Sequence, residues 1–373
     1  MSKRSVSPEV SEENQESKRL CQDEQPKGET SKGDESITSV VEAHYNDLKE
    51  KGLDDRNKSR IVYLRNFNNW IKSMLINEYV KKFRSEKDDN SEISVLDMCC
   101  GKGGDLLKWK NNNVQHLVCA DLAQLSVEEC QRRFEEMKHR NSYSNNNKSY
   151  TAEFITADCT QVRLKEKFQN PDLLLDMVSC QFAFHYSFES LPQAECMIRN
   201  AAESLRPGGF FIGTIPDAND IVARLKKSDS SSFGNEVFSI KFDSEDKESF
   251  ALFGAKYEFF LEGVVNCPEF LVHFPTLIKL ASNFGLKLVA KERFQDYFER
   301  MKEEGRGLMG RMQTLETYPP FEKTDLLGKQ EEYQHADKYL QEHTTTARVG
   351  TLTQSEWEAL TLYLVFAFQK EAS

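Results

Sequence analysis

Short apolar runs alternate with segments of helical periodicity across the middle of the chain. Runs rich in Val, Ile, Leu and Phe predict strands at residues 93–98, 116–121, 153–158, 173–182 and 210–216. Apolar residues at helical spacing predict helices between them, at 102–110, 125–137 and 192–205, the last ended by Arg-Pro-Gly-Gly at 206–209. This alternation is typical of an α/β fold whose mostly parallel sheet is covered by helices on both faces.

Further elements are expected on both sides of this core. The patterns predict helices at 40–48 and 61–83, aromatic-rich strands in an irregular region at 217–274, a charged helical segment at 295–348, and strands at 286–294 and 361–370 that rejoin the sheet. We therefore expect one domain over residues 39–373, with insertions near 217–274 and 295–348.

The first 38 residues differ sharply in composition from this domain. They are rich in Ser, Glu, Lys, Gln and Asp and nearly free of large apolar side chains, which predicts a disordered tail over residues 1–38. The pairs Lys3-Arg4 and Lys18-Arg19 are spaced like a weak bipartite nuclear signal, with two chance dibasic pairs as the alternative. No apolar run reaches about 18 residues and no secretory signal is visible, so we expect a soluble protein without a membrane span.

The acidic net charge of the chain bears on which classes of function are expected. The formal net charge is −11, which argues against a general nucleic-acid coat but not against an enzyme that binds one nucleotide in a pocket. Residues 51–87 depart from this balance, with ten Lys and Arg against four Asp and Glu. This segment is either a phosphate-facing surface or an ordinary solvated face.

The cysteines give little positive signal. The chain has nine, including the adjacent pair Cys99 and Cys100, and no CxxC or HxxxH spacing typical of a metal site. Neither disulfides nor zinc are favoured, so we expect a reducing compartment and no metal.

The sharpest motif is VLDMCCGKGGDL, at residues 95–106. A predicted strand ends near an acid, Asp97, and a glycine-rich turn leads into a predicted helix. Glycines let the backbone approach a ligand closely, and a helix start offers free N–H groups. The dinucleotide motif GxGxxG would require glycine where Cys99 stands, so the spacing fits the S-adenosylmethionine loop of Rossmann-like methyltransferases better.

Two further acids stand at the ends of predicted strands. Asp121 follows Asp97 by about 24 residues, where a Rossmann-type site places a carboxylate on the ribose hydroxyls. Asp158 ends the third strand, where it could meet the adenine amino group. Capping of the following helix is the plain alternative for both.

The fourth strand runs into SCQFAFHYSF, at residues 179–188. It lacks the Asp/Asn-Pro-Pro-Tyr/Phe clamp of enzymes that methylate exocyclic amines, and the Pro-Cys nucleophile used at pyrimidine C5; Cys267-Pro268 has the reverse order. The methyl acceptor is therefore expected to be a more intrinsically nucleophilic atom.

Five motifs together resemble one family. FNNWIK (67–72), LDMCCGKGGDLLKWK (96–110), CQFAFHYSFES (180–190), PEFLVHFP (268–275) and YLVFAF (363–368) are similar to the eukaryotic mRNA cap guanine-N7 methyltransferases, over roughly Val40 to the C-terminus. The resemblance implies a Rossmann-like class I methyltransferase fold, with a mostly parallel seven-stranded sheet and inserted cap-binding elements. It implies S-adenosylmethionine as cofactor and the capped RNA 5′ end as substrate.

The same resemblance implies a set of site residues. The implied cofactor contacts are Lys72, Asp97, Cys99, Asp121, Asp158, Gln181 and Tyr186. The implied cap contacts are Asn68, Asn69, Lys102, Lys108, Arg133, His185, Glu269 and Tyr363. The family usually has glycine at position 99, so a requirement for positive φ there would strain Cys99 or weaken cofactor binding.

The implied reaction needs no acid–base residue, because guanine N7 carries an in-plane lone pair and no proton. Positioning by Glu269, His185 and Tyr186 is expected to suffice. Glu269 is expected to accept from guanine N1–H and the N2 amine, and Lys102, Lys108 and Arg133 to face the triphosphate. The alternatives are a loop glutamate, solvated helix-face cations, a structural histidine and, for Tyr363, ordinary core packing.

Other functions stay open at this stage. The alternatives are a methyltransferase acting on a small molecule or a protein, and a non-catalytic homologue that binds the cap or cofactor, with Cys99 as the lesion. By resemblance alone, we expect a nuclear protein, a small activating protein subunit and contact with the transcription and capping machinery.

Overall fold

The computed structural model describes residues 37–47, 58–87, 92–141 and 150–372. The helices are α1 (Ile37–Asp47), α3 (Val62–Ser85), α4 (Leu106–Asn111), α5 (Gln124–Asn141), α6 (Leu191–Ala202), α7 (Ala218–Lys227), α8 (Phe274–Asn283), α9 (Phe294–Met301), α10 (Arg306–Met312), α11 (Gln334–Glu342) and α12 (Gln354–Leu360). Short 3-10 helices are η1 (Leu164–Lys167), η2 (Phe184–Glu189) and η3 (Gln330–Tyr333).

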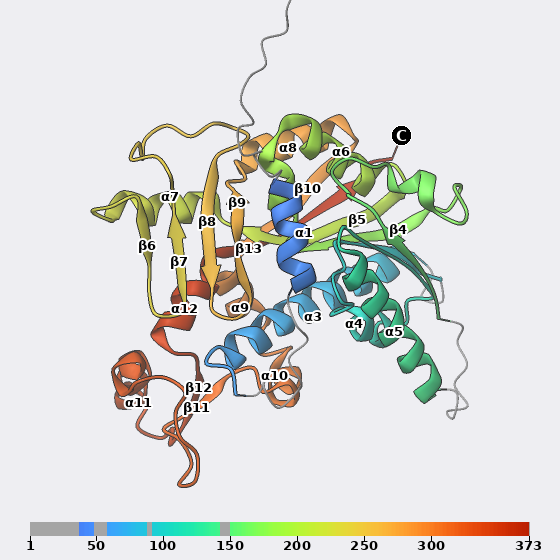
Figure 1. The fold of residues 1–373 in the computed structure, drawn as a ribbon. Coiled ribbons are helices and arrows are strands. Elements are labelled where there is room, and N and C mark those ends of the chain that lie inside the picture. The colour runs from blue at the N-terminus through green and yellow to red at the C-terminus, as the bar shows by residue number, and fades with distance from the viewer. Residues whose placement is uncertain (1–36, 48–57, 88–91, 142–149, 373) are drawn as a thin grey trace, which may run out of the picture. The chain divides into compact units, whose positions relative to one another are not determined.

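The main sheet has seven strands in the order β10-β13-β5-β4-β1-β2-β3 (Figure 1). They are β1 (Ser94–Met98), β2 (His116–Asp121), β3 (Thr151–Thr156), β4 (Leu175–Gln181), β5 (Leu205–Pro216), β10 (Leu286–Arg293) and β13 (Tyr363–Lys370). Strands β1 to β5 pair in parallel, and β13 lies antiparallel between β5 and β10. The expected Rossmann-like class I methyltransferase fold is therefore confirmed.

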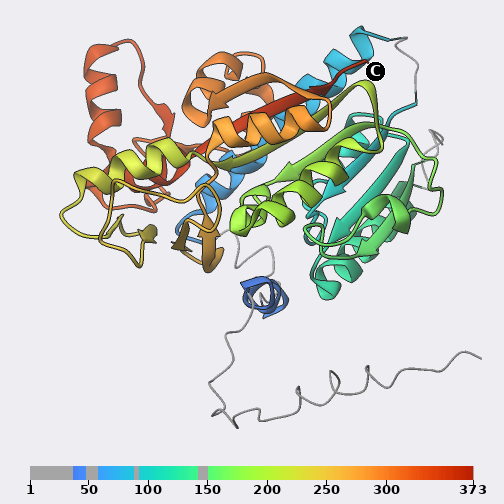
Figure 2. The ribbon, with the colours of Figure 1, turned by 90° about the horizontal axis from the view of Figure 1, so that it is seen from above.

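Successive strand residues pack on opposite faces of this sheet, as the pleat requires. Val95 and Leu117 belong to a hydrophobic cluster that includes α3, whereas Leu96 and Val118 belong to a second cluster with α6 and α8. Seen from above, the long light-blue helix α3 lies on one side of the sheet, and green α6 with orange α8 lies on the other (Figure 2). Burial on both faces explains the continuous apolar runs of the strands.

Two smaller sheets come from the expected insertions. The first is antiparallel, in the order β6 (Ser232–Gly234), β7 (Phe238–Lys241), β8 (Lys256–Leu261) and β9 (Val265–Phe270), and stands beside the main sheet (Figure 1). The second pairs β11 (Glu316–Tyr318) with β12 (Val349–Thr351). No helix in the described residues is long and apolar enough to cross a membrane.

Three local expectations were wrong. The helix expected over 102–110 begins only at Leu106, because the glycine-rich residues before it form a turn. The helix expected over 192–205 ends at Ala202. Arg-Pro-Gly-Gly at 206–209, which was expected to end this helix, lies within β5. The segment 295–348 is only partly helical, since β11 and a loop separate α10 from α11.

The described residues contain only part of the expected tail and of the basic segment at 51–87. Of the tail expected over 1–38, residues 1–36 lie outside the described residues, the two Lys-Arg pairs included, and Ile37 and Thr38 begin α1. Several cations of the basic segment that the structure describes are already paired: Arg60 with Glu332, Lys72 with Asp105 and Lys81 with Glu304. Part of the positive charge of this segment is therefore engaged in ion pairs within the domain.

Candidate active site

A cavity of about 330 Å³ lies at the carboxyl ends of β1, β2 and β4. This is where open α/β sheets bind ligands, since the strand order reverses between β1 and β4. Six of the seven residues expected to contact the cofactor line it: Lys72, Cys99, Asp121, Asp158, Gln181 and Tyr186. They come from α3, η2 and the ends of four strands, so the fold brings together residues more than 110 positions apart.

The glycine-rich turn forms one wall of the cavity. Gly101 and Gly103 have φ of +51° and +76°, and a Cβ on Gly103 would meet Leu106 and Cys130 at 2.7 and 2.8 Å. Glycine is required at Gly103 on both counts. The Gly101 N–H donates to Asp121 Oδ2 at 2.8 Å, which ties this turn to the end of β2.

Asp121 holds its position through backbone donors on two sides. Besides the bond from Gly101, its Oδ1 accepts the Ala123 N–H at 3.0 Å. Burial raises the pKa of this carboxyl, and the two backbone bonds oppose that shift. Asp121 therefore braces the turn and also borders the cavity, so the capping alternative and the ligand role are not exclusive.

Cys99 adopts the left-handed backbone conformation that was expected to strain a residue other than glycine at this position. Its φ is +57°, a region that costs a non-glycine residue roughly 1–2 kcal/mol. Its thiol lies near those of Cys159 and Cys180. The positive φ that was expected to strain this position is therefore present.

Asp97 departs from its expected role, because it does not line the cavity. Its side chain is buried, and Oδ2 accepts the Trp109 Nε1–H at 3.2 Å. Burial, followed by the nearby Asp105, raises the pKa of Asp97 well above its ordinary value. Through its Oδ2, Asp97 contacts α4 behind the turn.

Asp158 borders the cavity but is engaged by its own turn. Oδ1 accepts from the backbone N–H and the hydroxyl of Thr160, at 2.8 and 2.6 Å, and Oδ2 accepts from Gln161 Nε2 at 2.8 Å. Asp158 thus closes a local turn instead of capping a helix, and each oxygen retains limited capacity for a further donor.

Gln181 has a buried side-chain oxygen that could accept a hydrogen bond from a ligand. Its Nε2 donates to Ser179 Oγ at 3.0 Å, whereas its buried Oε1 has no hydrogen-bond partner within the described structure. Buried acceptors are rarely left unsatisfied. An unpaired amide oxygen and carboxylates at two strand ends are hydrogen-bond acceptors. Together with the glycine-rich turn they fit a nucleoside with hydroxyl and amine donors, such as S-adenosylmethionine.

A buried ion-pair network joins the cavity to α3 and α4. Asp105 Oδ1 lies 2.9 Å from Lys72 Nζ and 2.7 Å from Lys108 Nζ, and Lys108 also donates to Asn69 Oδ1 at 3.1 Å. Burial alone would raise the pKa of Asp105, but Lys108 and Lys72 hold it well below its ordinary value. Asp105 thus gathers three of the expected site residues, although it was not itself expected.

The remaining expected polar contacts are less closely grouped. Arg133 lies on α5, pairs with Glu129 at 2.7 Å, and borders a separate hollow with Gly103 and Gly104. Lys102 is half-buried in the glycine-rich turn and does not line the cavity. Asn68 on α3 has a buried Oδ1 without a hydrogen-bond partner in the residues described.

A buried polar cluster lies next to the cavity, on β9. Glu269 is 3% exposed, and its Oε2 accepts the Tyr257 hydroxyl at 2.8 Å from the adjacent strand β8. Its Oε1 lies 3.2 Å from Nε2 of the buried His185, without hydrogen-bond geometry. Burial, followed by Glu269, raises the pKa of Tyr257 well above its ordinary value, so the hydroxyl stays a donor.

Tyr186 connects this cluster to the cavity. Its ring centroid lies 4.4 Å from that of His185, and its hydroxyl lies 3.3 Å from Cys267 Sγ on β9. Since Tyr186 itself lines the cavity, Glu269 and His185 stand directly behind one cavity wall. Tyr363 is buried on β13 and packs edge-on against Phe182 at 5.1 Å, which fits core packing as well as a site role.

Sequence reasoning missed three contributors. Asp105 stands within the quoted motif LDMCCGKGGDLLKWK, so its acid in a lysine-rich context was an available signal. Tyr257 lies in an aromatic-rich strand and carries no sequence signal for its bond to Glu269. Helix α1 contributes Ile37, Thr38 and Val41 to the cavity lining, whereas two of these positions were assigned to the tail.

Comparison with known proteins agrees with this geometry. Residues 29–371 match the family model for the mRNA (guanine-N(7))-methyltransferase domain. A relative from Drosophila melanogaster named mRNA cap guanine-N(7) methyltransferase is 53% identical over 335 residues, covering 89% of this chain and 77% of that protein. The Caenorhabditis elegans relative of the same name is 40% identical, and the alignment covers 90% of this chain and 88% of that protein.

A plant relative and a solved bacterial structure are more distant. A rice relative, mRNA cap guanine-N(7) methyltransferase 1, is 36% identical over 88% of this chain and 80% of its own. A solved S-adenosylmethionine-dependent methyltransferase from Clostridium acetobutylicum aligns over 82% of this chain and 92% of its own, at 10% identity and a TM-score of 0.43. The motifs, the site and the relatives agree: the chain belongs to the mRNA cap guanine-N7 methyltransferase family, whose members are S-adenosylmethionine-dependent enzymes.

Proposed function

We propose that this protein transfers the methyl group of S-adenosylmethionine to N7 of the terminal guanine of capped RNA, with Glu269 selecting the guanine. One observation carries the residue assignment: a buried carboxylate, held by Tyr257, lies beside the cavity whose wall is formed by Tyr186. A buried carboxylate with spare acceptor capacity is costly unless a ligand supplies donors.

Guanine recognition follows from the acceptors of this cluster. Glu269 accepts from guanine N1–H and the N2 amine, and its charge offsets the positive charge that grows on the ring as N7 is methylated. Tyr257 holds one carboxylate oxygen in place through its hydroxyl. His185 and Tyr186 shape the pocket, Asn68 and Asn69 border it from α3, and Tyr363 adds an aromatic surface for the base.

Cofactor binding rests on the cavity-lining residues. Asp121 accepts from the ribose hydroxyls, and Gln181 and Asp158 provide acceptors for the adenine amine. Lys72 and the backbone at Cys99 border the methionine end. Bound S-adenosylmethionine supplies an electrophilic methyl group on a sulfonium, and Asp97 supports the site through α4 without touching the ligand.

Phosphate binding is assigned to cations on α4, the glycine-rich turn and α5. Lys108 is positioned by Asp105 and Asn69, Lys102 stands in the turn, and Arg133 borders a hollow that shares Gly104 with the cavity. Charge-assisted contacts to phosphate are strong, so these three cations are suited to hold the phosphates of the cap. They favour a triphosphate-bridged substrate over a small metabolite or a protein.

The site needs no general base, because N7 carries no proton. The protein's contribution is to align the acceptor nitrogen with the methyl group, to keep water out and to stabilise the cationic product. Alignment alone can supply several kcal/mol, roughly within the 7–11 kcal/mol range known for well-oriented reactions.

Methyl transfer from labelled S-adenosylmethionine to GpppG-capped RNA tests the assignment. We expect label in 7-methylguanosine after nuclease digestion, and none with uncapped RNA. A cofactor affinity in the micromolar range without transfer would instead favour the non-catalytic homologue. Transfer to small metabolites or proteins in preference to capped RNA would favour the other alternative.

The nuclear site of action is part of the proposal and rests on the family's substrate and on Lys3-Arg4 and Lys18-Arg19, which lie outside the described residues. A fluorescent fusion with both pairs changed to Ala should lose nuclear accumulation. A small activating protein and contact with the capping machinery are proposed by resemblance alone. Co-purification from nuclear extract tests them, with the same chain lacking residues 1–36 as comparison.

A further inference from the structure

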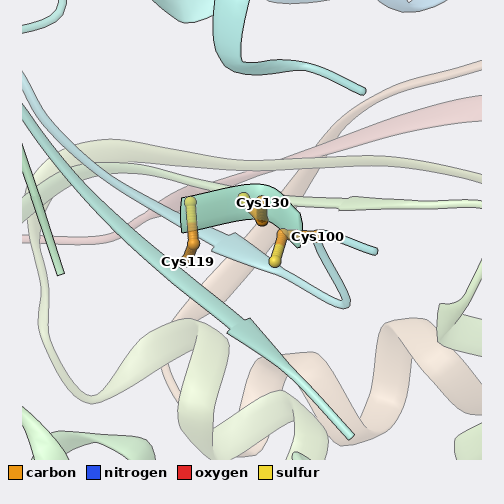
Figure 3. A group of neighbouring side chains, drawn as sticks. All are labelled: Cys100, Cys119 and Cys130. Carbon is orange, nitrogen blue, oxygen red and sulfur yellow. The ribbon is translucent and has the colours of Figure 1, made fainter. Parts of the chain in front are cut away.

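Three cysteines that are scattered in the sequence meet behind the glycine-rich turn. Cys100 stands in that turn, Cys119 in β2 and Cys130 in α5, and their Sγ atoms all lie within 4.8 Å of one another. Figure 3 shows the three side chains converging from these separate elements. Cys119 and Cys130 are fully buried, whereas Cys100 is half-buried and borders the cofactor cavity.

The spacing suits a shared metal ion. Thiolates bound to one ion at about 2.3 Å, with tetrahedral to trigonal angles, stand roughly 3.8–4.0 Å apart. The three Sγ atoms need to close by less than about 1 Å to reach this spacing from their 4.8 Å limit. Two Sγ atoms joined in a disulfide would have to approach to about 2.05 Å and would leave the third unused.

The surroundings restrict which ion fits. Leu106, Phe134 and Tyr150 belong to the same hydrophobic cluster as these cysteines, and the Gly103 backbone approaches Cys130 Sγ closely. Among the residues that the structure describes, no further His, Cys, Asp or Glu joins the group. Three sulfur ligands without oxygen or nitrogen select soft ions over Mg²⁺, Ca²⁺ or Mn²⁺.

We propose that Cys100, Cys119 and Cys130 form a binding site for a soft, thiophilic metal ion, held by three thiolates. Binding forms three sulfur–metal bonds, releases the three thiol protons to solvent, and changes no oxidation state. The proposal does not rest on the methyl-transfer proposal, because none of the three cysteines is among the residues assigned to the cofactor or the cap, although Cys100 borders the cofactor cavity.

Occupancy would link three elements that shape the cofactor cavity. The metal ion would join Cys100 in the glycine-rich turn to Cys119 in β2 and to Cys130 in α5. Cys119 lies two residues before Asp121. A ligand that binds only the folded state raises its stability. We therefore expect metal binding to raise Tm by a few degrees and to leave the cavity accessible.

Titration of the reduced, full-length protein with Cd²⁺ tests the site. We expect ultraviolet sulfur-to-cadmium charge-transfer absorption that saturates at one equivalent, and displacement of the probe by excess chelator. Cys130→Ser and Cys100→Ser should each lower the Cd²⁺ affinity by roughly 100-fold or more, because even loss of an outer partner of a metal ligand costs 10–100-fold. Circular dichroism and Tm without metal check that both variants are folded.

Two matched variants locate the signal. Cys196→Ser removes a cysteine on α6, outside the group, and should leave the titration unchanged. Cys159→Ser removes a thiol next to Cys99 and should also leave it unchanged. A signal that survives in both Cys130→Ser and Cys100→Ser, or that vanishes in Cys159→Ser, overturns the proposal. Absence of saturable absorption in the folded wild type overturns it as well, and the three thiols are then core packing.

Discussion

The part of the site that we propose to face the cofactor and the part that we propose to face the cap are built in different ways. In the first part, Asp121 and Asp158 stand at strand ends. Asp121 accepts the backbone N–H groups of Gly101 and Ala123, and Asp158 accepts that of Thr160. Toward the cap, Glu269 is buried between strands, and its described hydrogen bond comes from another side chain, Tyr257. The first part is organised by backbone, and the second by side chains from separate elements.

This difference predicts how each part responds to change. A carboxylate bonded to backbone donors has a local structural role as well as a ligand role, so its loss affects both. A buried carboxylate with few partners depends on its ligand for satisfaction, so a mismatch there is expressed mainly in binding and catalysis. The cap-facing cluster should therefore show the larger and more specific functional effects.

The largest effect is expected for Glu269→Gln. The amide keeps the shape but presents one acceptor and one donor to two guanine donors, and it removes the charge that favours the methylated product. The cost should be on the order of 2–4 kcal/mol, or roughly 30–1,000-fold in kcat/KM, with cofactor affinity unchanged. The loss should persist at every pH at which the protein is folded, because N7 needs no deprotonation.

A matched variant sharpens this result. Tyr257→Phe removes the hydroxyl that holds Glu269 but leaves the charge, so we expect a loss of about tenfold, in line with one hydrogen bond to a charged group. Near wild-type kcat/KM on GpppG-capped RNA for Glu269→Gln would contradict the assignment of the whole segment 268–275 to cap recognition.

A smaller but still large effect is expected for Asp121→Ala on cofactor affinity. Loss of a charged hydrogen-bond partner typically costs ~1.5–3 kcal/mol, or roughly 10–150-fold. Calorimetry with S-adenosylmethionine measures the affinity. Because Asp121 also braces Gly101, the analogue lacking both ribose hydroxyls is the control: it should bind the wild type weakly and lose little more in the variant. Equal losses for both ligands would assign Asp121 to bracing alone.

Truncation at the N-terminus compares tail and helix directly. A chain that begins at Ile37 should keep wild-type kcat, because residues 1–36 have no composition suited to forming a pocket. A chain that begins at Lys58 also lacks α1, whose Val41 lines the cavity. We expect this second chain to lose roughly tenfold in cofactor affinity, about the value of burying one apolar side chain. Equal affinities would remove α1 from the site.

The smallest effect is expected at Cys99. Glycine relieves the left-handed backbone, whereas alanine removes the same thiol but keeps the Cβ, so Cys99→Gly should be more stable than Cys99→Ala by about 1 kcal/mol. Urea denaturation of the two variants measures the difference. Cofactor affinity should not fall in Cys99→Gly. An alanine variant as stable as the glycine variant would show that this backbone conformation carries no strain.

Much of the cofactor-facing part could be predicted from sequence. A parallel sheet places the ends of its strands at one edge, so an acid at the end of each apolar run is already located by the run itself. Asp121 and Asp158 line one cavity for this reason, whereas Gln181, which lines the same cavity, was expected by resemblance alone. Asp97 is the exception, because its carboxylate turns inward to the Trp109 indole, a choice of side-chain direction that no pattern encodes.

The cap-facing part was reached only through resemblance. Residue-level reasoning gave Glu269 no more than a loop position, and Tyr257 nothing, because their contact depends on the register between β8 and β9. Likewise, the boundary of α4 was misplaced because glycines permit either a helix start or a turn. In the folded chain, the Gly101 N–H donates to the distant Asp121 and the Gly103 N–H donates to the Cys100 carbonyl, so these residues form a turn.

The sequence by itself determined the parallel core, the ligand edge and the family, because apolar periodicity and strand-end motifs are local properties of the chain. Only the tertiary structure decided which distant side chains share a buried space: Asp105 with its two lysines, Glu269 with Tyr257, and the three cysteines at positions 100, 119 and 130. Such groups depend on packing between elements far apart in sequence, and their spacing along the chain follows no rule for a metal or a binding site.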